Sequence, residues 1–237
     1  MPFELATPDK NDFLANLSQV RETIAKAAAA CGRKESEITL AAVTKNFDIS
    51  AGQMAVEAGL DVLCENRVQE AEWKYGESFP GKELHLIGHL QTNKAQKAVA
   101  LADSIDSVDS LRLAEVLNIA AQKCHKTMPV LLEVNIGDDP AKSGISFSDI
   151  DDFCARISAL EHISLRGLMT ILPLGCGHKE KLDFFSKLYQ KYIDIQNQRT
   201  YTDFSQLSMG MSDDYAEAVL CGATTLRIGT ALFGKRH

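Results

Sequence analysis

The sequence lacks the features that mark membrane and secreted proteins. No apolar run approaches the roughly 20 residues that a membrane-spanning helix needs, and the amino terminus has neither a basic start nor the long apolar core of a signal peptide. The six Cys are widely spaced, and no two of them form a Cys-x-x-Cys pair. A chain of 237 residues can build its core without disulfides. We therefore expect a cytoplasmic protein with reduced thiols.

An excess of positive charge is also missing. The chain has 25 Lys and Arg against 32 Asp and Glu, a net charge of −7, which argues against a broad nucleic-acid surface. Cys176 and His178 stand close together, but no second motif completes the three or four ligands that a zinc site needs. A hydrophobic content of 45% is that of a globular protein. We expect a monomer with no metal, no nucleic-acid partner and no membrane partner.

Apolar residues recur in two patterns that alternate along the chain. The first is helical, because Phe13, Leu17 and Val20 share one helix face and Gly32 follows as a stop. The second consists of short apolar runs, which are typical of buried strands. Eight such runs begin near Ile38, Asp61, Leu84, Ser104, Val130, Leu165, Gln206 and Thr224. Helical stretches separate them, and one is expected to begin with a capping box at Ser148–Asp151.

Eight strand–helix units behind a first helix predict an α/β fold. We expect a single-domain (β/α)8 TIM-like barrel in residues 1–237, ordered over about 10–235, with an extra N-terminal helix. Gly59 and Gly222 each stand where a helix would end and a strand would follow at once. A doubly wound open sheet is the alternative. Its dinucleotide-binding version is disfavoured because no Gly-x-Gly-x-x-Gly follows the first strand.

Lys45 closes the first predicted strand, and in a barrel the carboxyl ends of the strands carry the site. A lysine in this place is unusual, because burying an ammonium group is costly. One interpretation is a Schiff-base lysine, whose amine attacks a carbonyl carbon. The other is a lysine just past the strand that extends its amine into water.

The seventh and eighth predicted strands both end in Gly and a hydroxyl residue. Backbone N–H groups at a helix start bind anions, and many barrels hold phosphate in the loops after these two strands. The alternative is that Ser212 and Thr230 only cap helices. Asp213 and Asp214 would repel a phosphate unless their side chains point away from it. Together with Lys45, these strand ends indicate a ligand that carries both a phosphate and a carbonyl group.

Arg227 lies inside the eighth predicted strand between two apolar residues. Arginine cannot shed its charge, so a side chain that faces the barrel needs a partner. That partner is either a carboxylate such as Glu133, in the fifth strand, or an acceptor on the ligand. Asn66, His85 and Asn135 also sit at or near strand ends and can supply hydrogen bonds.

Seven motifs, taken in order, are similar to those of one known family. They are Ala42-Val-Thr-Lys45, Glu65-Asn-Arg-Val-Gln-Glu70, His85-Leu-Ile-Gly-His-Leu-Gln-Thr-Asn-Lys94, Lys142-Ser-Gly144, Arg166-Gly-Leu-Met169, Ser208-Met-Gly-Met-Ser-Asp-Asp214 and Arg227-Ile-Gly-Thr-Ala-Leu-Phe-Gly234. Over about residues 10–235 the chain resembles the YggS/PROSC family of pyridoxal 5′-phosphate (PLP) homeostasis proteins. The resemblance implies the alanine racemase N-terminal type of barrel, PLP fold type III, with PLP as cofactor.

The resemblance also implies a role for each candidate residue. Lys45 matches the lysine that forms the Schiff base, and Arg227 matches the arginine that faces the pyridine nitrogen. The phosphate-binding positions and their neighbours are Met209, Gly210, Ser212, Gly229 and Thr230, and the cofactor-lining motifs contain Asn66 and His85. Two departures from the family pattern are Leu63-Cys64, where Phe-Gly is usual, and Asn46-Phe47 after the lysine.

The implied function is intracellular PLP homeostasis or PLP carriage with little or no turnover. It involves no catalytic residue, and its recipients would be PLP-dependent apoenzymes. One alternative is an amino-acid racemase-like PLP enzyme; since only three residues follow Gly234, we expect no second domain of the racemase kind. A class I aldolase-like barrel, in which Lys45 attacks the substrate without a cofactor, is another alternative.

Overall fold

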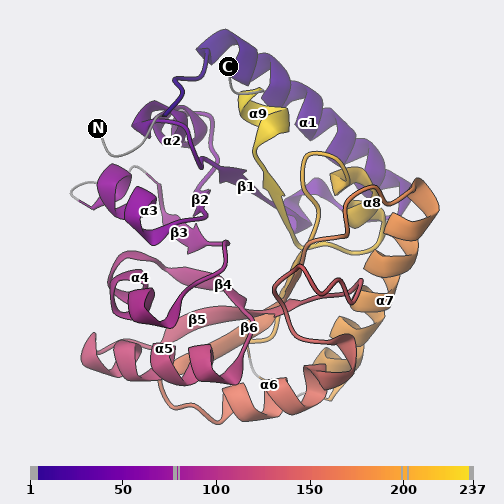
Figure 1. The fold of residues 1–237 in the computed structure, drawn as a ribbon. Helices are drawn as coiled ribbons and strands as arrows, with labels where there is room; N and C mark the ends of the chain where they lie inside the picture. The colour runs from indigo at the N-terminus through magenta and orange to yellow at the C-terminus, as the bar shows by residue number, and fades with distance from the viewer. Residues whose placement is uncertain (1–4, 77–78, 80, 199, 202, 235–237) are drawn as a thin grey trace.

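Eight parallel strands close into a barrel in the chain order β1 to β8, which confirms the predicted (β/α)8 architecture (Figure 1). The computed structural model describes residues 5–76, 79, 81–198, 200–201 and 203–234. The strands are β1 Thr39–Val43, β2 Val62–Glu65, β3 Glu83–Leu86, β4 Ser104–Val108, β5 Met128–Val134, β6 Ile163–Thr170, β7 Gln206–Ser208 and β8 Thr225–Ile228. Each lies within or beside one of the eight apolar runs. A closed parallel barrel replaces the open-sheet alternative.

Helices follow the strands and form the outer ring seen in Figure 1. The α-helices are α1 Lys10–Ala30, α2 Ile49–Glu57, α3 Val68–Tyr75, α4 Ala95–Leu101, α5 Leu111–Lys123, α6 Ile150–Ser158, α7 His178–Asn197, α8 Tyr215–Leu220 and α9 Thr230–Phe233. Short 3-10 turns are η1 Glu35–Glu37, η2 Thr92–Lys94 and η3 Phe147–Asp149. As predicted, Gly59 and Gly222 adopt positive φ angles of 82° and 91° at the junctions before β2 and β8.

The N-terminal helix α1 closes the ring by packing against the last two helices, α8 and α9. Phe13 of α1 stacks on Phe233 of α9, with ring centroids 5.2 Å apart. Asp9 caps α1 by accepting hydrogen bonds from the N–H groups of Asn11 and Asp12. The extra helix therefore belongs to the barrel's outer layer.

The predicted capping box at Ser148–Asp151 is wrong. A 3-10 turn, η3, precedes α6, and Ser146 caps that turn by accepting from the N–H of Ser148. Asp149 stands at the start of α6 without a side-chain capping bond. The capping serine therefore lies two residues upstream of the predicted one, because a 3-10 turn that leads into α6 begins there.

The barrel interior differs from the core outside it. Successive strand residues point to opposite faces, and the outer ones, such as Leu226 and Ile228, join the large apolar core beneath the helices. The inward positions hold a small apolar cluster formed by Ala41, Val43, Val62, Cys64 and Ile87. They also hold buried polar residues that alternate with outer-core residues, namely His85, Asp106, Glu133 and Arg227. Charges thus occupy a space that barrels usually fill with branched apolar side chains.

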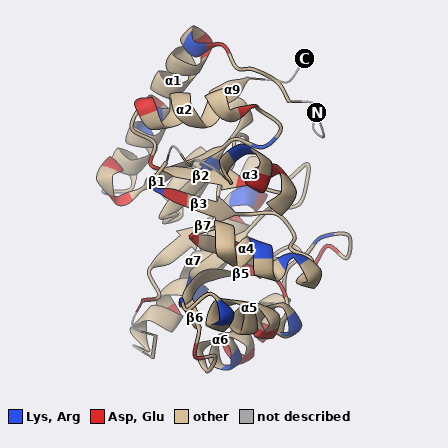
Figure 2. Cartoon of the chain, turned by 90° about the vertical axis from the view of Figure 1, so that its left-hand side faces the viewer, with Lys and Arg blue, Asp and Glu red and all other residues tan. Residues whose placement is uncertain are grey.

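The outer surface carries both signs of charge. Figure 2 shows basic and acidic residues interspersed along the helices that face the viewer. Among the described residues, no helix is both long enough and apolar enough to cross a membrane.

Candidate functional site

Lys45 lies in the turn directly after β1, at the carboxyl end of the barrel. The turn is anchored by the N–H of Thr44, which donates to the carbonyl oxygen of Cys64 at the end of β2 (3.1 Å). Asn46 follows in the left-handed region with φ 62°, a conformation that Asn tolerates better than most residues. This accounts for the Asn that follows the lysine in the sequence. Lys45 itself is half-buried.

The loops after β7 and β8 are joined to each other. Ser212 Oγ accepts a hydrogen bond from the N–H of Ala231 in the first turn of α9 (3.0 Å), and the N–H of Arg227 donates to the carbonyl oxygen of Gly210 (3.0 Å). Gly210 has φ 96°, and a Cβ there would come within 2.6 Å of Ala218 Cβ. Ser212 therefore connects the two strand ends, because its hydroxyl bonds to the first turn of α9.

The same loops lie against the end of β1. A Cβ on Gly229 would stand 3.3 Å from the carbonyl oxygen of Val43, two residues before Lys45. Gly229 is also the residue before α9, which begins at Thr230. The closed barrel thus brings the lysine turn and the Gly210–Thr230 region together at one edge, where β8 pairs with β1.

The two aspartates of the β7 loop are directed differently. Asp214 is buried and accepts a hydrogen bond from the N–H of Met211 in its own loop. Burial raises the pKa of Asp214, although this backbone bond and the charge of Lys181 oppose the rise. Asp213 is exposed, and its carbonyl oxygen accepts from Lys181 Nζ. The Asp214 carboxylate is therefore engaged by its own loop.

Arg227 points into the barrel and is 2% exposed. Its guanidinium donates to Ser208 Oγ (2.7 Å) and to the carbonyl oxygen of Thr170 (2.8 Å). The expected alternative partner, Glu133, forms no ion pair with it in the described part of the chain. Burial lowers the pKa of Arg227, and the negative charge of Asp106 is the strongest influence in the other direction. A buried cation whose bonded partners are neutral can accommodate an acceptor from a ligand.

His85 is not brought together with the other candidates. Its Nδ1 lies 3.0 Å from Asp106 Oδ2, and its Nε2 lies 3.1 Å from Glu83 Oε2. Burial disfavours the charged ring, but the two carboxylates outweigh it and raise the pKa of His85 to about 10. The ring borders a cavity of about 410 Å³ lined by residues at the amino ends of the strands, such as Lys126. His85 therefore faces the end of the barrel opposite Lys45.

Asn66 and Met209 both follow the carboxyl end of a strand, β2 and β7 respectively, but their surroundings differ. Asn66 follows β2, and its backbone packs so closely on Gly88 that a Cβ there would lie 2.4 Å from the Asn66 carbonyl oxygen. Asn66 also borders a cavity of about 280 Å³ with Arg67 and Lys94. Met209 is fully buried, and its N–H donates to the carbonyl oxygen of Thr225 (3.1 Å). Met209 thus supports the β7–β8 pairing.

Several buried charged residues were not among the candidates predicted from the sequence. Asp106 pairs with His85, and its charge raises the pKa of Arg227 against the effect of burial. Glu65, Glu70 and Lys74 form an ion cluster with 1% exposure or less behind the lysine turn. The available signal was the one used for Arg227, a charged residue within an apolar strand run. It applied to Asp106 and Glu65 as well.

Comparison with known proteins places these residues in a family. The family model described as alanine racemase, N-terminal domain, matches residues 15–237. The "Pyridoxal phosphate homeostasis protein" of Escherichia coli K12 is 36% identical over 230 residues, which are 95% of this chain and 97% of that protein.

Comparison with solved structures points to the same family and fold. PipY of Synechococcus elongatus, with PLP bound, is 38% identical with a TM-score of 0.78, and the match covers 89% of this chain and 100% of that one. The alanine racemase of Clostridium difficile 630 shares the fold, with 15% identity and a TM-score of 0.73 over 98% of this chain and 59% of that one. By sequence, by family model and by fold, the chain belongs to the pyridoxal phosphate homeostasis protein family, built on the alanine racemase N-terminal barrel.

Proposed function

We propose that this chain binds PLP at the carboxyl end of its barrel and acts in PLP homeostasis as a carrier with little or no turnover. The observation that carries the proposal is the pairing of β8 with β1 and the close approach of Gly229 to the end of β1, where a Cβ would stand 3.3 Å from the Val43 carbonyl oxygen. This closeness supports a site in which an amine and anion-binding groups share one edge. PLP carries an aldehyde and a phosphate on one ring, so it needs both. The structure of PipY with PLP bound supports the choice of ligand.

The residues present fit the three parts of the cofactor. Lys45 supplies the amine for the aldehyde. Ser212, Thr230 and the N–H groups around Gly229 supply donors for the phosphate. Arg227 supplies a buried N–H donor for the ring nitrogen, and because a guanidinium has no acceptor for a protonated ring nitrogen, it disfavours the protonated ring. PLP with an unprotonated ring is a weaker electron sink, which suits a carrier better than an enzyme.

Asn66, Gly210 and Met209 complete the proposed surroundings of the cofactor, whereas His85 is left out because it points to the opposite end of the barrel. We further propose that the protein acts in the cytoplasm and delivers PLP to apoenzymes. Its working state is proposed to be a monomer.

The test is borohydride reduction of the protein loaded with PLP, followed by mass spectrometry of the peptides. We expect a pyridoxyl group on Lys45 and no label in Lys45→Ala. A label only on another lysine, such as Lys142, would overturn the site. Exchange of the alanine Cα proton with solvent deuterium, at rates on the order of 1 s⁻¹ or faster, would favour the racemase-like enzyme over the carrier.

A further inference from the structure

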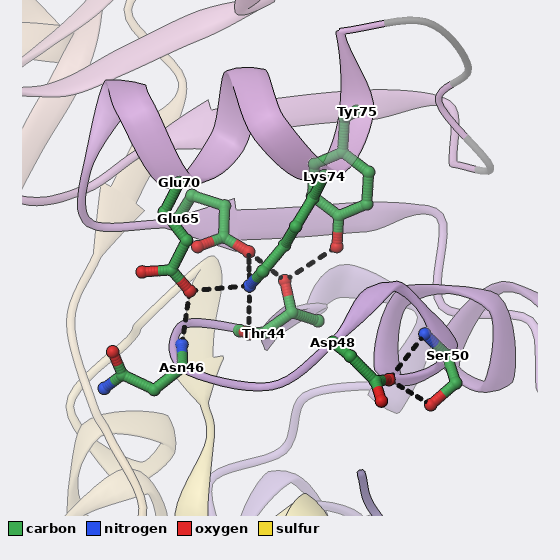
Figure 3. Close-up of polar contacts among 8 residues, drawn as sticks. All are labelled: Thr44, Asn46, Asp48, Ser50, Glu65, Glu70, Lys74 and Tyr75. Atoms are coloured by element: carbon green, nitrogen blue, oxygen red, sulfur yellow. Dashed lines mark hydrogen bonds and ion pairs between the residues drawn. The ribbon is translucent and has the colours of Figure 1, made fainter. Parts of the chain in front are cut away.

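Three ionisable side chains with almost no exposure lie behind the Lys45 turn (Figure 3). Lys74 Nζ of α3 is 2.8 Å from Glu65 Oε1 at the end of β2 and 2.7 Å from Glu70 Oε1, one turn earlier in α3. The exposed fractions of the three side chains are 0% to 1%. We call Glu65, Glu70 and Lys74 the ion cluster.

The ion cluster bonds to the backbone on both sides of Lys45. Lys74 Nζ donates to the carbonyl oxygen of Thr44 (2.8 Å), and the N–H of Asn46 donates to Glu70 Oε1. Thr44 Oγ1 also donates to Glu65 Oε1 (2.7 Å). Lys45 is thus the residue between two peptide groups that the ion cluster holds.

A gain in folding stability does not by itself explain a buried cluster of this kind. Taking ions out of water costs about as much as their attraction returns, and apolar replacements of similar volume are often no less stable. Here Glu65 Oε2 remains buried without a hydrogen-bond partner among the described residues, so the cluster is not even fully satisfied. The bonds of the ion cluster instead restrict the conformation of the Lys45 turn, which includes the left-handed backbone at Asn46.

The same helix offers a contrast. Glu72 of α3 pairs with Lys97 of α4 at 2.9 Å, and both side chains are about half exposed. Pairs of that kind contribute little to stability. Two glutamates two residues apart in α3 therefore have different roles, and only Glu70 reaches the backbone next to Lys45.

We propose that Glu70 and Lys74 are positioning residues for Lys45, and that they aim its amine at the aldehyde of the ligand. This inference rests on the proposed function. In the step concerned, the neutral amine nitrogen of Lys45 forms a C=N bond to the aldehyde carbon, and the aldehyde oxygen leaves as water with the two amine protons. The ion cluster aids this step and leaves the phosphate and ring contacts unaffected, since the phosphate groups lie in the loops after β7 and β8 and the ring contact comes from Arg227 in β8.

The test compares PLP with pyridoxine 5′-phosphate, which has an alcohol in place of the aldehyde and cannot form the C=N bond. The variants are Lys74→Met and Glu70→Gln, with Lys97→Met and Glu72→Gln as matched controls. We expect Lys74→Met to weaken PLP binding about tenfold or more, as misplacement of a reacting group does. Glu70→Gln keeps an acceptor for the Asn46 N–H, so it should have a smaller effect of about threefold. Affinity for pyridoxine 5′-phosphate should stay within about twofold in every variant, and the controls should match the parent for both ligands.

Equal losses for the two ligands would overturn the proposal, because they would mean a general structural role. Unchanged PLP affinity in both variants would overturn it as well. If Lys74→Met does not fold, the affinities of Glu70→Gln for PLP and for pyridoxine 5′-phosphate are compared in its place. The second readout is the pH at which the absorbance of the bound PLP changes. A shifted pH with an unchanged melting temperature supports positioning, and an unshifted pH contradicts it. Failure of the proposed function would be seen separately, as a parent protein without label on Lys45.

Discussion

Two buried cations in the barrel interior are stabilised in different ways. His85 lies between the carboxylates of Asp106 and Glu83, at 3.0 Å and 3.1 Å, so protein groups of opposite charge flank both of its ring nitrogens. Arg227 is as deeply buried, but its guanidinium donates to a hydroxyl and a carbonyl oxygen, at 2.7 Å and 2.8 Å. The first cation belongs to an ion pair that the protein completes by itself. The second cation, Arg227, forms its hydrogen bonds with neutral groups, so its charge is available to interact with a ligand.

The comparison indicates where function resides in this barrel. A completed buried pair stabilises one end of the interior, next to the cavity at the amino ends of the strands. An incompletely compensated cation stands near the carboxyl ends, where barrel sites occur. Removing a partner should therefore damage folding in the first case and ligand binding in the second.

The largest effect is expected for Asp106→Asn. This change keeps the shape of the side chain but leaves His85 buried without its nearest counter-charge, and breaking a buried pair costs about 3–5 kcal/mol. Urea unfolding at pH 7 measures it. Glu83→Gln is the control, because Glu83 is 57% exposed and its loss should cost under about 1 kcal/mol. Similar costs for the two variants would contradict a completed pair between His85 and Asp106.

The same pair predicts a dependence on pH. The pKa of His85 is raised to about 10 in the folded protein from its ordinary value of 6.5. Its contribution is therefore complete below about pH 6.5 and is lost as pH rises through 10, a change of about 5 kcal/mol at most. The measurement is the free energy of unfolding of the parent minus that of His85→Gln, at intervals from pH 6 to pH 10. A difference that does not change over this window would exclude a charged His85.

Arg227→Met should affect the ligand more than the fold. It removes a charged donor, and hydrogen bonds to charged groups contribute about 1.5–3 kcal/mol, so PLP affinity should fall about tenfold or more. Loss of the bonds to Ser208 and Thr170 should lower stability by about 1–3 kcal/mol. Titration of PLP into folded protein separates the two effects. Arg166→Met makes the same change at the cavity near the amino ends of the strands and should leave PLP affinity unaltered. Equal losses of PLP affinity in the two variants would contradict the distinction between the two ends of the barrel.

The smallest effect concerns Glu133, a further buried ionisable group of the interior. Burial and the neighbouring charge of Asp109 raise its pKa to about 7 from 4.5, although Arg227 and His89 oppose this. Because the folded pKa is raised, the stability present at low pH is lost as pH rises from 4.5 through 7. Glu133→Gln should therefore add about 1–2 kcal/mol at pH 8 and almost nothing at pH 5. A gain of the same size at both pH values would point to packing and would contradict a titrating carboxyl.

Much of the fold could be predicted from local patterns. The eight apolar runs located the eight strands, and Gly59 and Gly222 marked two helix–strand junctions because positive φ angles favour glycine. The place of Lys45 followed from its position after an apolar run. The capping box failed because a 3-10 turn capped by Ser146 precedes α6, and residue preferences do not show where such a turn begins.

His85 shows where prediction of the site stopped. The sequence put it near the end of β3, but its ring is directed toward Asp106 and Glu83 and so toward the other end of the barrel. The partners of Arg227 were equally hidden, since Ser208 and Thr170 belong to two other strands. Neither periodicity nor composition says which way a polar side chain leans inside a closed barrel.

The sequence by itself determined the α/β class of fold, the positions of the strands along the chain and the residues that stand at their carboxyl ends, because apolar periodicity and turn residues act over a few neighbouring positions. Only the tertiary structure decided which buried charges meet. The close approach of Gly229 to β1 needs the barrel to close, and the bonds from Glu70 and Lys74 to the Lys45 turn need α3 to pack over it. Ionic and hydrogen-bonded partners are selected by distance in space, and residues 24 to 30 positions apart become neighbours only after folding.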